Sequence, residues 1–137
     1  MNTQAFKTLY HCTYALNYHL VIVTKYRKKC LTAPMLEELR LICQKQVELK
    51  EGSLVEFNGE ADHVHLLIEL PPKASLSMLV NSLKTVTSRL IRRDHEKHLA
   101  QYYWKPVLWS RSYFVASCGG APLAVIKKYI EQQEAPH

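Results

Sequence analysis

The sequence has no apolar run that approaches the ~18 residues needed by a membrane-spanning helix, and residues 1–10 contain no apolar segment like that of a signal peptide. It also has no C-x-x-C pair, because its cysteines are scattered: Cys12, Cys30, Cys43 and Cys118. This spacing disfavours a disulfide framework or a zinc knuckle and favours free thiols in a reducing compartment. We therefore expect a cytoplasmic protein with no membrane partner, in which residues 1–10 form a flexible arm.

A phosphate-binding loop of the form G-x-x-x-x-G-K-[ST] is absent as well. The sequence therefore gives no reason to expect the use of ATP. It has one H-x-H motif and no second copy of it, so a hydrolytic phosphoesterase that uses two H-x-[TS] motifs is a weak alternative.

Apolar residues make up 47% of the 137 residues, which is enough for one sizeable core, so we expect a single domain over residues 1–137. Lysine and arginine number 18 against 12 aspartate and glutamate, for a net charge of +6. The excess of cations favours a polyanionic partner such as nucleic acid. From charge alone, a mildly basic cytosolic domain without such a partner is an equal alternative.

The most informative segment runs from Asp62 to Leu70, where apolar residues alternate with His63 and His65. Alternation with a period of two predicts a half-buried strand that places both imidazoles on one face. Residues two apart on a strand are separated by roughly 7 Å, so two inward-leaning rings can share one divalent ion. Solvated or hydrogen-bonded histidines on a sheet are the alternative, since an H-x-H pair alone is a weak signal.

The remaining periodicities predict an α+β fold with the order β-α-β-β-α-β-α. It is a ferredoxin-like, RRM-like antiparallel sheet with two helices on one face, and the histidine face stays open to DNA and to the last helix. A capping residue at Thr32 or Ala33 and an N-cap at Ser75 mark the starts of the first two helices. The expected elements are strands over 11–24, 54–59, 62–70 and 102–117, and helices over about 33–50, 76–91 and 123–134.

Cations gather in two regions. In residues 25–29, four cations surround Tyr26, as in grooves that bind single-stranded nucleic acid through phosphates and base stacking. The polar side of the second helix carries almost no acidic residue before Asp94, which favours contact with phosphates. A solvated polar face is nevertheless the default for an amphipathic helix. The predicted DNA-binding residues are Lys25, Tyr26, Arg27, Lys28, Lys84, Arg89, Arg92, Arg93 and Arg111.

The last predicted helix carries Tyr129 and Gln133 one turn apart, so both side chains face the same partner. A tyrosine beside an apolar stripe is most often a packing residue. Before this helix, Cys118 to Pro122 include two adjacent glycines that can act as a joint. The long aromatic strand predicted before the joint is a candidate surface for pairing with a second copy of the chain.

Several of these blocks together resemble the single-tyrosine HUH transposases of small bacterial insertion sequences, to which the REP-associated tyrosine transposases are related. Each block alone is unspecific, but together they span nearly the whole chain in the family's order and spacing. The blocks are Tyr18-His19-Leu20-Val21, Thr24-Lys25-Tyr26-Arg27, Asp62-His63-Val64-His65-Leu66-Leu67, Trp109-Ser110-Arg111-Ser112-Tyr113-Phe114-Val115 and Tyr129-Ile130-Glu131-x-Gln133.

The resemblance implies a role for each matching residue. His63 and His65 match the pair that binds a divalent cation, magnesium or manganese, and Gln133 matches the residue that completes the metal shell. Tyr129 matches the nucleophile that becomes linked to a DNA 5′ end. The family acts on single-stranded DNA with subterminal hairpins, as homodimers in which the tyrosine helix can be exchanged between subunits. Gly119-Gly120 is then a candidate hinge for that helix.

The function expected from the resemblance is a transposase, a single-strand DNA endonuclease and strand transferase that works through a phosphotyrosine intermediate. A non-catalytic module that binds single-stranded nucleic acid is the main alternative, since it would share the sheet, the cations and the aromatic residues. A relative retained by the host and acting on chromosomal repeats is another, because the sequence does not separate it from the enzyme of a mobile element.

Overall fold

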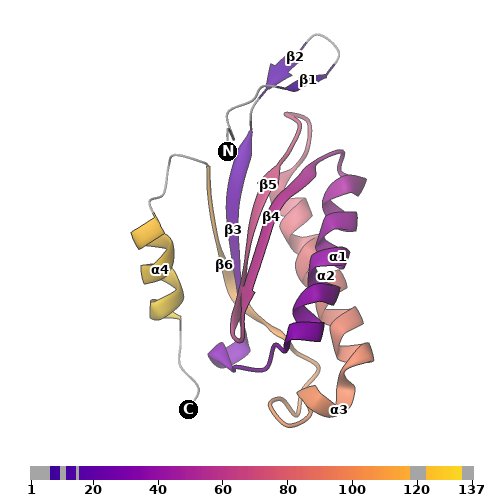
Figure 1. Ribbon diagram of the computed structural model, residues 1–137, viewed down its shortest axis with the longest axis vertical. Coiled ribbons are helices and arrows are strands. Elements are labelled where there is room, and N and C mark those ends of the chain that lie inside the picture. The colour runs from indigo at the N-terminus through magenta and orange to yellow at the C-terminus, as the bar shows by residue number, and fades with distance from the viewer. Residues whose placement is uncertain (1–6, 10–11, 15, 118–122, 134–137) are drawn as a thin grey trace.

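A computed structural model describes residues 7–9, 12–14, 16–117 and 123–133 of this chain. Its centre is an antiparallel sheet of four strands in the order β4-β5-β3-β6. A separate short pair, β1 with β2, lies beyond one end of this sheet (Figure 1). The strands are β1 (Lys7–Leu9), β2 (Cys12–Tyr14), β3 (Asn17–Thr24), β4 (Ser53–Glu60), β5 (His63–Glu69) and β6 (Trp109–Ser117).

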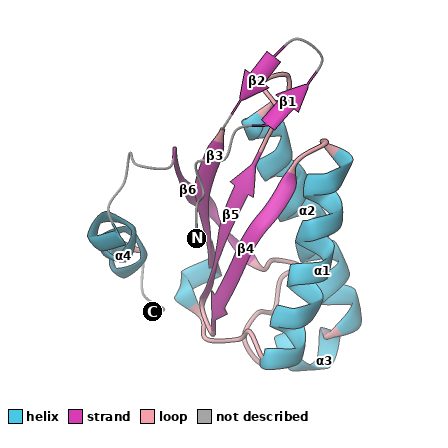
Figure 2. Ribbon diagram, turned by 45° about the horizontal axis from the view of Figure 1, so that its top comes forward, coloured by secondary structure: helices cyan, strands magenta, loops and turns pink. Residues whose placement is uncertain are grey.

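Two long helices, α1 (Ala33–Leu49) and α2 (Leu76–Asp94), cover one face of the four-stranded sheet. The short α3 (Glu96–Leu99) follows α2, and α4 (Leu123–Gln132) lies on the opposite side of the sheet (Figures 1 and 2). From β3 onward the order is the predicted β-α-β-β-α-β-α, with the short helices η1 (Lys25–Arg27) and α3 added. The predicted α+β fold, with helices one and two on one face, is confirmed.

The alternation of side chains on the central strand β3 gives the sheet its two faces. Leu20 and Ile22 are buried in the main core beneath α1 and α2. Val21 and Val23 point the other way and form a second, smaller cluster that includes Tyr129 of α4. The main hydrophobic core therefore lies between the sheet and the two long helices, and a thin apolar layer seats α4.

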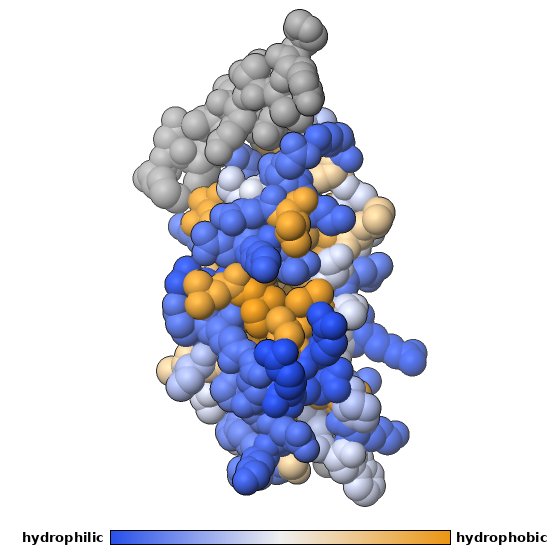
Figure 3. Space-filling view, turned by 90° about the vertical axis from the view of Figure 1, so that its right-hand side faces the viewer, coloured by the Kyte–Doolittle hydropathy of each residue, from blue (hydrophilic) through white to orange (hydrophobic). Residues whose placement is uncertain are grey.

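The starts of both long helices follow the predicted capping signals. The Thr32 hydroxyl accepts a hydrogen bond from the Met35 amide at 3.4 Å, and the Ser75 hydroxyl accepts one from the Met78 amide at 3.3 Å. Each bond satisfies a backbone donor that the helix itself cannot pair. The outward side of these helices is mainly hydrophilic and is broken by small apolar areas (Figure 3).

The predicted strand over 102–117 is too long, because only Trp109–Ser117 form β6. Thr24 is the last residue of β3 and pairs with Trp109, so the segment before Trp109 has no partner strand to extend along. That segment is instead fixed by Tyr103, whose hydroxyl donates to the Lys25 carbonyl at 2.6 Å. Pro106 also lacks the amide that a paired strand position needs.

Several other boundaries differ from the prediction. The strand expected over 11–24 is divided into β2 and β3, and Lys7–Leu9 form β1, which the sequence analysis did not predict. The residues after α2 form the short helix α3, whose His98 Nε2 lies 2.7 Å from the Cys30 carbonyl. Such contacts between distant residues carry no local sequence signal.

Cys30 and Cys43 agree with the expectation of free thiols. Cys30 and Cys43 are buried and unbridged, and burial raises the pKa of Cys43 to about 12. Within the described residues, no helix is long and apolar enough to cross a bilayer.

Two glycines give a matched test of the packing between α1 and the sheet. A Cβ at Gly52 would lie 2.6 Å from the Glu69 carbonyl oxygen and 2.8 Å from Leu70 Cδ2, whereas a Cβ at Gly59 would meet only the end of the Leu36 side chain. Backbone cannot move aside as easily as a flexible side chain. We expect Gly52→Ala to lower the free energy of unfolding by about 1–3 kcal/mol and Gly59→Ala by less, measured by urea denaturation. Equal losses would contradict this packing.

Candidate active site

The strand β5 places His63 and His65 on the face that α1 and α2 leave uncovered. Val64, Leu66 and Ile68 are buried in the main core, while the two histidines are half-buried on the other side. In the register of the sheet, His63 lies opposite Val23 and His65 opposite Val21 of β3. The predicted orientation of the histidine pair is therefore what the structure shows.

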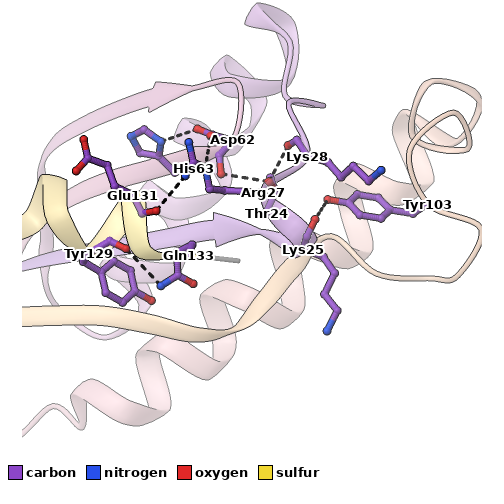
Figure 4. A network of polar contacts seen from close by, with 10 residues as sticks. All are labelled: Thr24, Lys25, Arg27, Lys28, Asp62, His63, Tyr103, Tyr129, Glu131 and Gln133. Carbon is purple, nitrogen blue, oxygen red and sulfur yellow. Dashed lines mark hydrogen bonds and ion pairs between the residues drawn. The ribbon is translucent and has the colours of Figure 1, made fainter. Parts of the chain in front are cut away.

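Asp62 orients His63. His63 Nδ1 lies 2.8 Å from Asp62 Oδ1, and Arg27 Nε donates to Asp62 Oδ2 at 3.1 Å (Figure 4). Burial raises the pKa of Asp62, but the hydrogen bonds from His63 and Arg27, aided by their charges, outweigh it and leave that pKa below its usual value. An ionised carboxylate only accepts, so His63 Nδ1 carries the hydrogen and Nε2 is the atom with a free lone pair.

His65 has a histidine neighbour that the sequence analysis did not assign to the site. Its Nε2 lies 3.0 Å from His19 Nδ1, and the two rings stack with centroids 5.1 Å apart. Burial lowers the pKa of His65, and the nearby His19 lowers it further. The neutral form, which is the form that binds metals, is thus favoured. The signal in the sequence was the alternation of His19 with Val21 and Val23 on one strand.

Arg27 of the short helix η1 contacts both Asp62, just before the histidine strand β5, and α4. Tyr26 and Arg27 have left-handed backbone angles, with φ of 59° and 57°, a conformation that costs a residue with a side chain roughly 1–2 kcal/mol. This turn carries Arg27 to Asp62 and also lets its Nη1 donate to the Glu131 carbonyl of α4 at 3.3 Å (Figure 4). Arg27 therefore ties the start of β5 to the end of α4.

The helix α4 brings Tyr129 and Gln133 onto the histidine face. The Tyr129 ring packs near Phe114 of β6, with centroids 5.2 Å apart, in the cluster that contains Val21 and Val23. The Tyr129 hydroxyl donates to Ser112 Oγ at 3.3 Å, and Ser112 in turn donates to Gln133 Oε1 at 3.2 Å. Tyr129 and Gln133 share a partner, as the helical spacing predicts.

Tyr129 does not point at the histidines in this structure. Its hydroxyl bonds to Ser112, and the ring is turned away from His63 (Figure 4). Ser112 was not predicted as a site residue, although the aromatic strand that contains it was part of the family pattern. The predicted hinge, Gly119-Gly120, lies outside the described residues and stays a prediction.

The site's donor set matches a divalent cation in type. Two imidazoles on one face, one of them held by a carboxylate, and the amide of Gln133 just after the facing helix are suitable ligands. Among the described residues no group of three His, Cys, Asp or Glu side chains is close enough to hold a metal ion. His65 and Gln133 would have to exchange their contacts with His19 and Ser112 to contribute to such a site.

The predicted DNA-binding cations occupy different surroundings. Lys84 is engaged, because its Nζ donates to the Ser110 and Arg111 carbonyls at 2.7 and 2.8 Å, and burial together with the charge of Lys25 lowers its pKa. Arg93 pairs with Asp94 at 2.7 Å. Lys25, Tyr26, Lys28 and Arg111 line one groove beside the segment 100–107, and Arg89, Arg92 and Arg93 line another. Arg27 lines neither groove and binds Asp62. Their contact with DNA stays a prediction.

Comparison with known proteins gives the class of protein that this sheet and site belong to. The chain is 32% identical to the transposase for insertion sequence element IS200 of Salmonella typhimurium over 127 residues, which are 93% of this chain and 82% of that protein. It is 29% identical to the ISDra2 transposase TnpA of Deinococcus radiodurans over 120 residues, 88% of this chain and 85% of the other.

Solved structures agree. A crystal structure of a transposase from Deinococcus radiodurans aligns with a TM-score of 0.83 at 31% identity and covers 94% of this chain and 98% of its own. A REP-associated tyrosine transposase bound to a REP hairpin aligns with a TM-score of 0.55 at 12% identity, covering 91% of this chain and 69% of its own, which shows a shared fold.

The family model described as "Transposase IS200 like" matches residues 12–133. The chain therefore belongs to the IS200-like family of tyrosine transposases, and the resemblance found in the sequence is confirmed. A transposase binds DNA and cleaves it, so the protein belongs to a family of DNA-acting enzymes.

The contacts of Asp62 predict a pH-dependent contribution to stability. Because its pKa in the folded protein lies below the unfolded value, the contribution is present above about pH 4 and is lost as pH falls through the folded pKa. We expect Asp62→Asn to lower the free energy of unfolding by about 1–3 kcal/mol at pH 7 and by much less at pH 3. Chemical denaturation at both pH values measures this.

Glu37→Gln is the matched control, because Glu37 forms an exposed pair with Arg40 on α1. It should change stability little at either pH. A loss for Asp62→Asn that is the same at pH 7 and pH 3 would show that the ionised carboxylate does not supply the stabilisation.

Proposed function

We propose that this transposase cleaves and rejoins single-stranded DNA at the ends of an insertion sequence through a covalent bond between Tyr129 and a DNA 5′ phosphate. The observation that carries the proposal is the packing of α4 on the histidine face, with Tyr129 over Val21 and Val23, the residues that pair with His65 and His63. The nucleophile and the histidines therefore share one face of one sheet.

The proposed reaction exchanges bonds of similar energy and therefore needs no external energy source. The Tyr129 oxygen attacks the phosphorus, its proton leaves, the bond from phosphorus to the 3′ oxygen breaks, and the departing strand takes up a proton to end in a 3′ hydroxyl. One phosphodiester is exchanged for another, so the reverse reaction with a new 3′ hydroxyl joins strands without ATP. This agrees with the absence of a phosphate-binding loop from the sequence.

A phenol with a pKa near 10 is a poor nucleophile at neutral pH, so the site has to accept its proton and stabilise the developing charge. We propose that His63, His65 and Gln133 hold magnesium or manganese. When bound, such a cation polarises the scissile phosphate as a Lewis acid. Magnesium prefers oxygen ligands, so water and phosphate oxygens would supply much of the shell.

The remaining residues of the site position these groups. Asp62 fixes His63 with Nε2 presented to the open face, and Arg27 fixes Asp62. Ser112 accepts the Tyr129 hydrogen bond in this structure, so the tyrosine has to leave Ser112 before it attacks. Rotation of the side chain, movement of α4, or supply of α4 by a second subunit would each achieve this.

We propose that the protein acts as a homodimer through β6. This strand is at the edge of the sheet, next to β3 only, and its nine residues offer a long row of backbone groups for pairing. Recognition of subterminal hairpins belongs to the same proposal. It is supported by the family resemblance, and a REP hairpin is the partner of the REP-associated relative with the same fold.

The test is incubation of the protein with single-stranded DNA that carries an end hairpin, in magnesium or manganese, followed by a denaturing gel. Wild type should give a covalent adduct and a free 3′ end, and Tyr129→Phe should give none. Tyr113→Phe is the matched control, because Tyr113 lies on the helix-covered side of β6 and its loss should leave the adduct. Absence of the adduct in wild type would instead support a non-catalytic DNA-binding module.

Two neighbouring glutamines test the metal ligands. Gln133 bonds to Ser112 on the histidine face, whereas Gln132 is exposed. We expect Gln133→Ala to lower the rate of adduct formation at least about tenfold, with partial recovery at higher manganese concentration, and Gln132→Ala to leave it unchanged. His63→Ala should abolish the adduct while binding of the same oligonucleotide persists. Equal rates of adduct formation for the two glutamine variants would show that Gln133 is not a metal ligand.

A further inference from the structure

Trp104 is the most exposed large apolar residue of the described chain, with 96% of its surface open to solvent. It lies in the segment between α3 and β6, and its aromatic neighbours behave differently, since Tyr103 and Trp109 are both buried at 8% exposure. A single exposed apolar side chain is common and needs no function. The surroundings of Trp104 are what make it informative.

A groove of about 930 Å³ runs between η1 and the segment that carries Trp104. Among the described residues, its lining includes four cations and no carboxylate: Lys25, Lys28, Lys105 and Arg111 accompany Tyr26 and Trp104. Lys25 Nζ lies 5.3 Å from the centre of the Tyr26 ring, and that ring is 45% exposed. Cations interleaved with exposed aromatic rings are how proteins hold single-stranded nucleic acid, through phosphates and stacked bases.

The walls of this groove are fixed by buried hydrogen bonds. The Lys25 amide donates to the Leu108 carbonyl at 2.8 Å, and the buried hydroxyl of Tyr103 donates to the Lys25 carbonyl at 2.6 Å. Burial, together with the neighbouring Cys30, raises the pKa of Tyr103, so the hydroxyl keeps the proton that it donates. Trp109 Nε1 donates to Thr87 at 2.8 Å. The exposed rings therefore project from a rigid surface, which reduces the entropy cost of binding.

Trp104 also borders a second groove of about 450 Å³, lined by Arg89, Arg92 and Arg93 of α2 together with Glu96. Trp104 is therefore shared by a groove with cations of η1 and a groove with cations of α2.

The short helix η1 links one wall of the first groove to the residues that orient His63. Thr24 donates its amide to the Asp62 carbonyl at 2.9 Å, and Arg27 binds the Asp62 carboxylate. Lys25, Lys28 and Tyr103 lie on the side of Arg27 away from His63 (Figure 4).

We propose that the groove is a binding site for an unpaired segment of the DNA substrate, in which one base stacks on Trp104 and the flanking phosphates pair with Lys25, Lys28, Lys105 and Arg111. The occupant is single-stranded, because only an unpaired base offers a free face to an aromatic ring, whereas duplex bases stack on each other. The proposal rests on the proposed function for its substrate and adds a site that the histidine face does not contain.

The test measures binding in the Tyr129→Phe background, so that cleavage does not interfere. The probe is a fluorescently labelled single-stranded oligonucleotide of mixed sequence, with the same strand annealed to its complement as the comparison. Trp104→Ala should raise the dissociation constant for the single strand roughly 5- to 100-fold and leave the duplex value within twofold. Trp104→Phe, which keeps an aromatic face, should recover most of the affinity.

Leu41→Ala is the matched control, because Leu41 is an exposed apolar residue of α1 outside both grooves, and it should bind as its parent does. Stacking also has a spectroscopic sign. The single strand should quench the fluorescence of the exposed Trp104, and the Trp104→Phe protein, which keeps only the buried Trp109, should show little quenching.

The proposal is overturned if Trp104→Ala binds the single strand within twofold of its parent, if it loses affinity for duplex equally, or if Trp104→Phe is as weak as Trp104→Ala. The adduct test on wild type is read separately. If wild type forms the adduct and Trp104→Ala binds normally, the proposed role of the groove is wrong and the proposed function stands. If wild type forms no adduct but Trp104→Ala shows the predicted loss of binding, the proposed function is wrong and the proposed role of the groove stands.

Discussion

The pairing of β3 with β5 at the centre of the sheet is the constraint on which the rest of the structure depends. Its register sets Val21 opposite His65 and Val23 opposite His63. Successive side chains of a strand face opposite ways, so a slip of one residue would turn the histidines into the apolar core. Leu20 and Ile22 are almost completely buried beneath α1 and α2. The free energy of burying these residues therefore also fixes the position of the histidines.

Asp62 links the sheet to the residues next to it. Only 7% of its surface is exposed, and its carboxylate holds His63 and Arg27 while its carbonyl accepts bonds from the Thr24 amide and hydroxyl. These bonds offset the cost of the left-handed angles at Tyr26 and Arg27. One residue thereby orients a histidine on one side and holds the turn that faces the basic groove on the other.

The features predicted from sequence were those with a local cause. Alternation over Asp62 to Leu70 predicted β5 and its two faces, and Thr32 and Ser75 predicted where two helices begin. The strand expected over 102–108 failed because its extent depends on where β3 ends, more than 80 residues earlier. The contacts of Tyr129 with Ser112 and of Arg27 with Asp62 also join distant positions, so charge and period alone did not reveal them.

The placement of charge is compatible with the proposal that one small sheet binds both a divalent cation and a polyanion. Cations that attract phosphate would repel a metal ion held nearby, and the repulsion between charges falls with distance and with screening. Arg27, the cation that contacts Asp62 beside His63, is paired with that ionised carboxylate. Lys25 and Lys28 extend away from His63 (Figure 4), and burial lowers the pKa of His65, which favours its neutral form. The proposed metal ligands thus present lone pairs beside the negative charge of Asp62, while the cations of the groove begin at η1. In the proposed reaction the scissile phosphate would lie at the histidines, and other phosphates of the unpaired strand would pair with the cations of the groove.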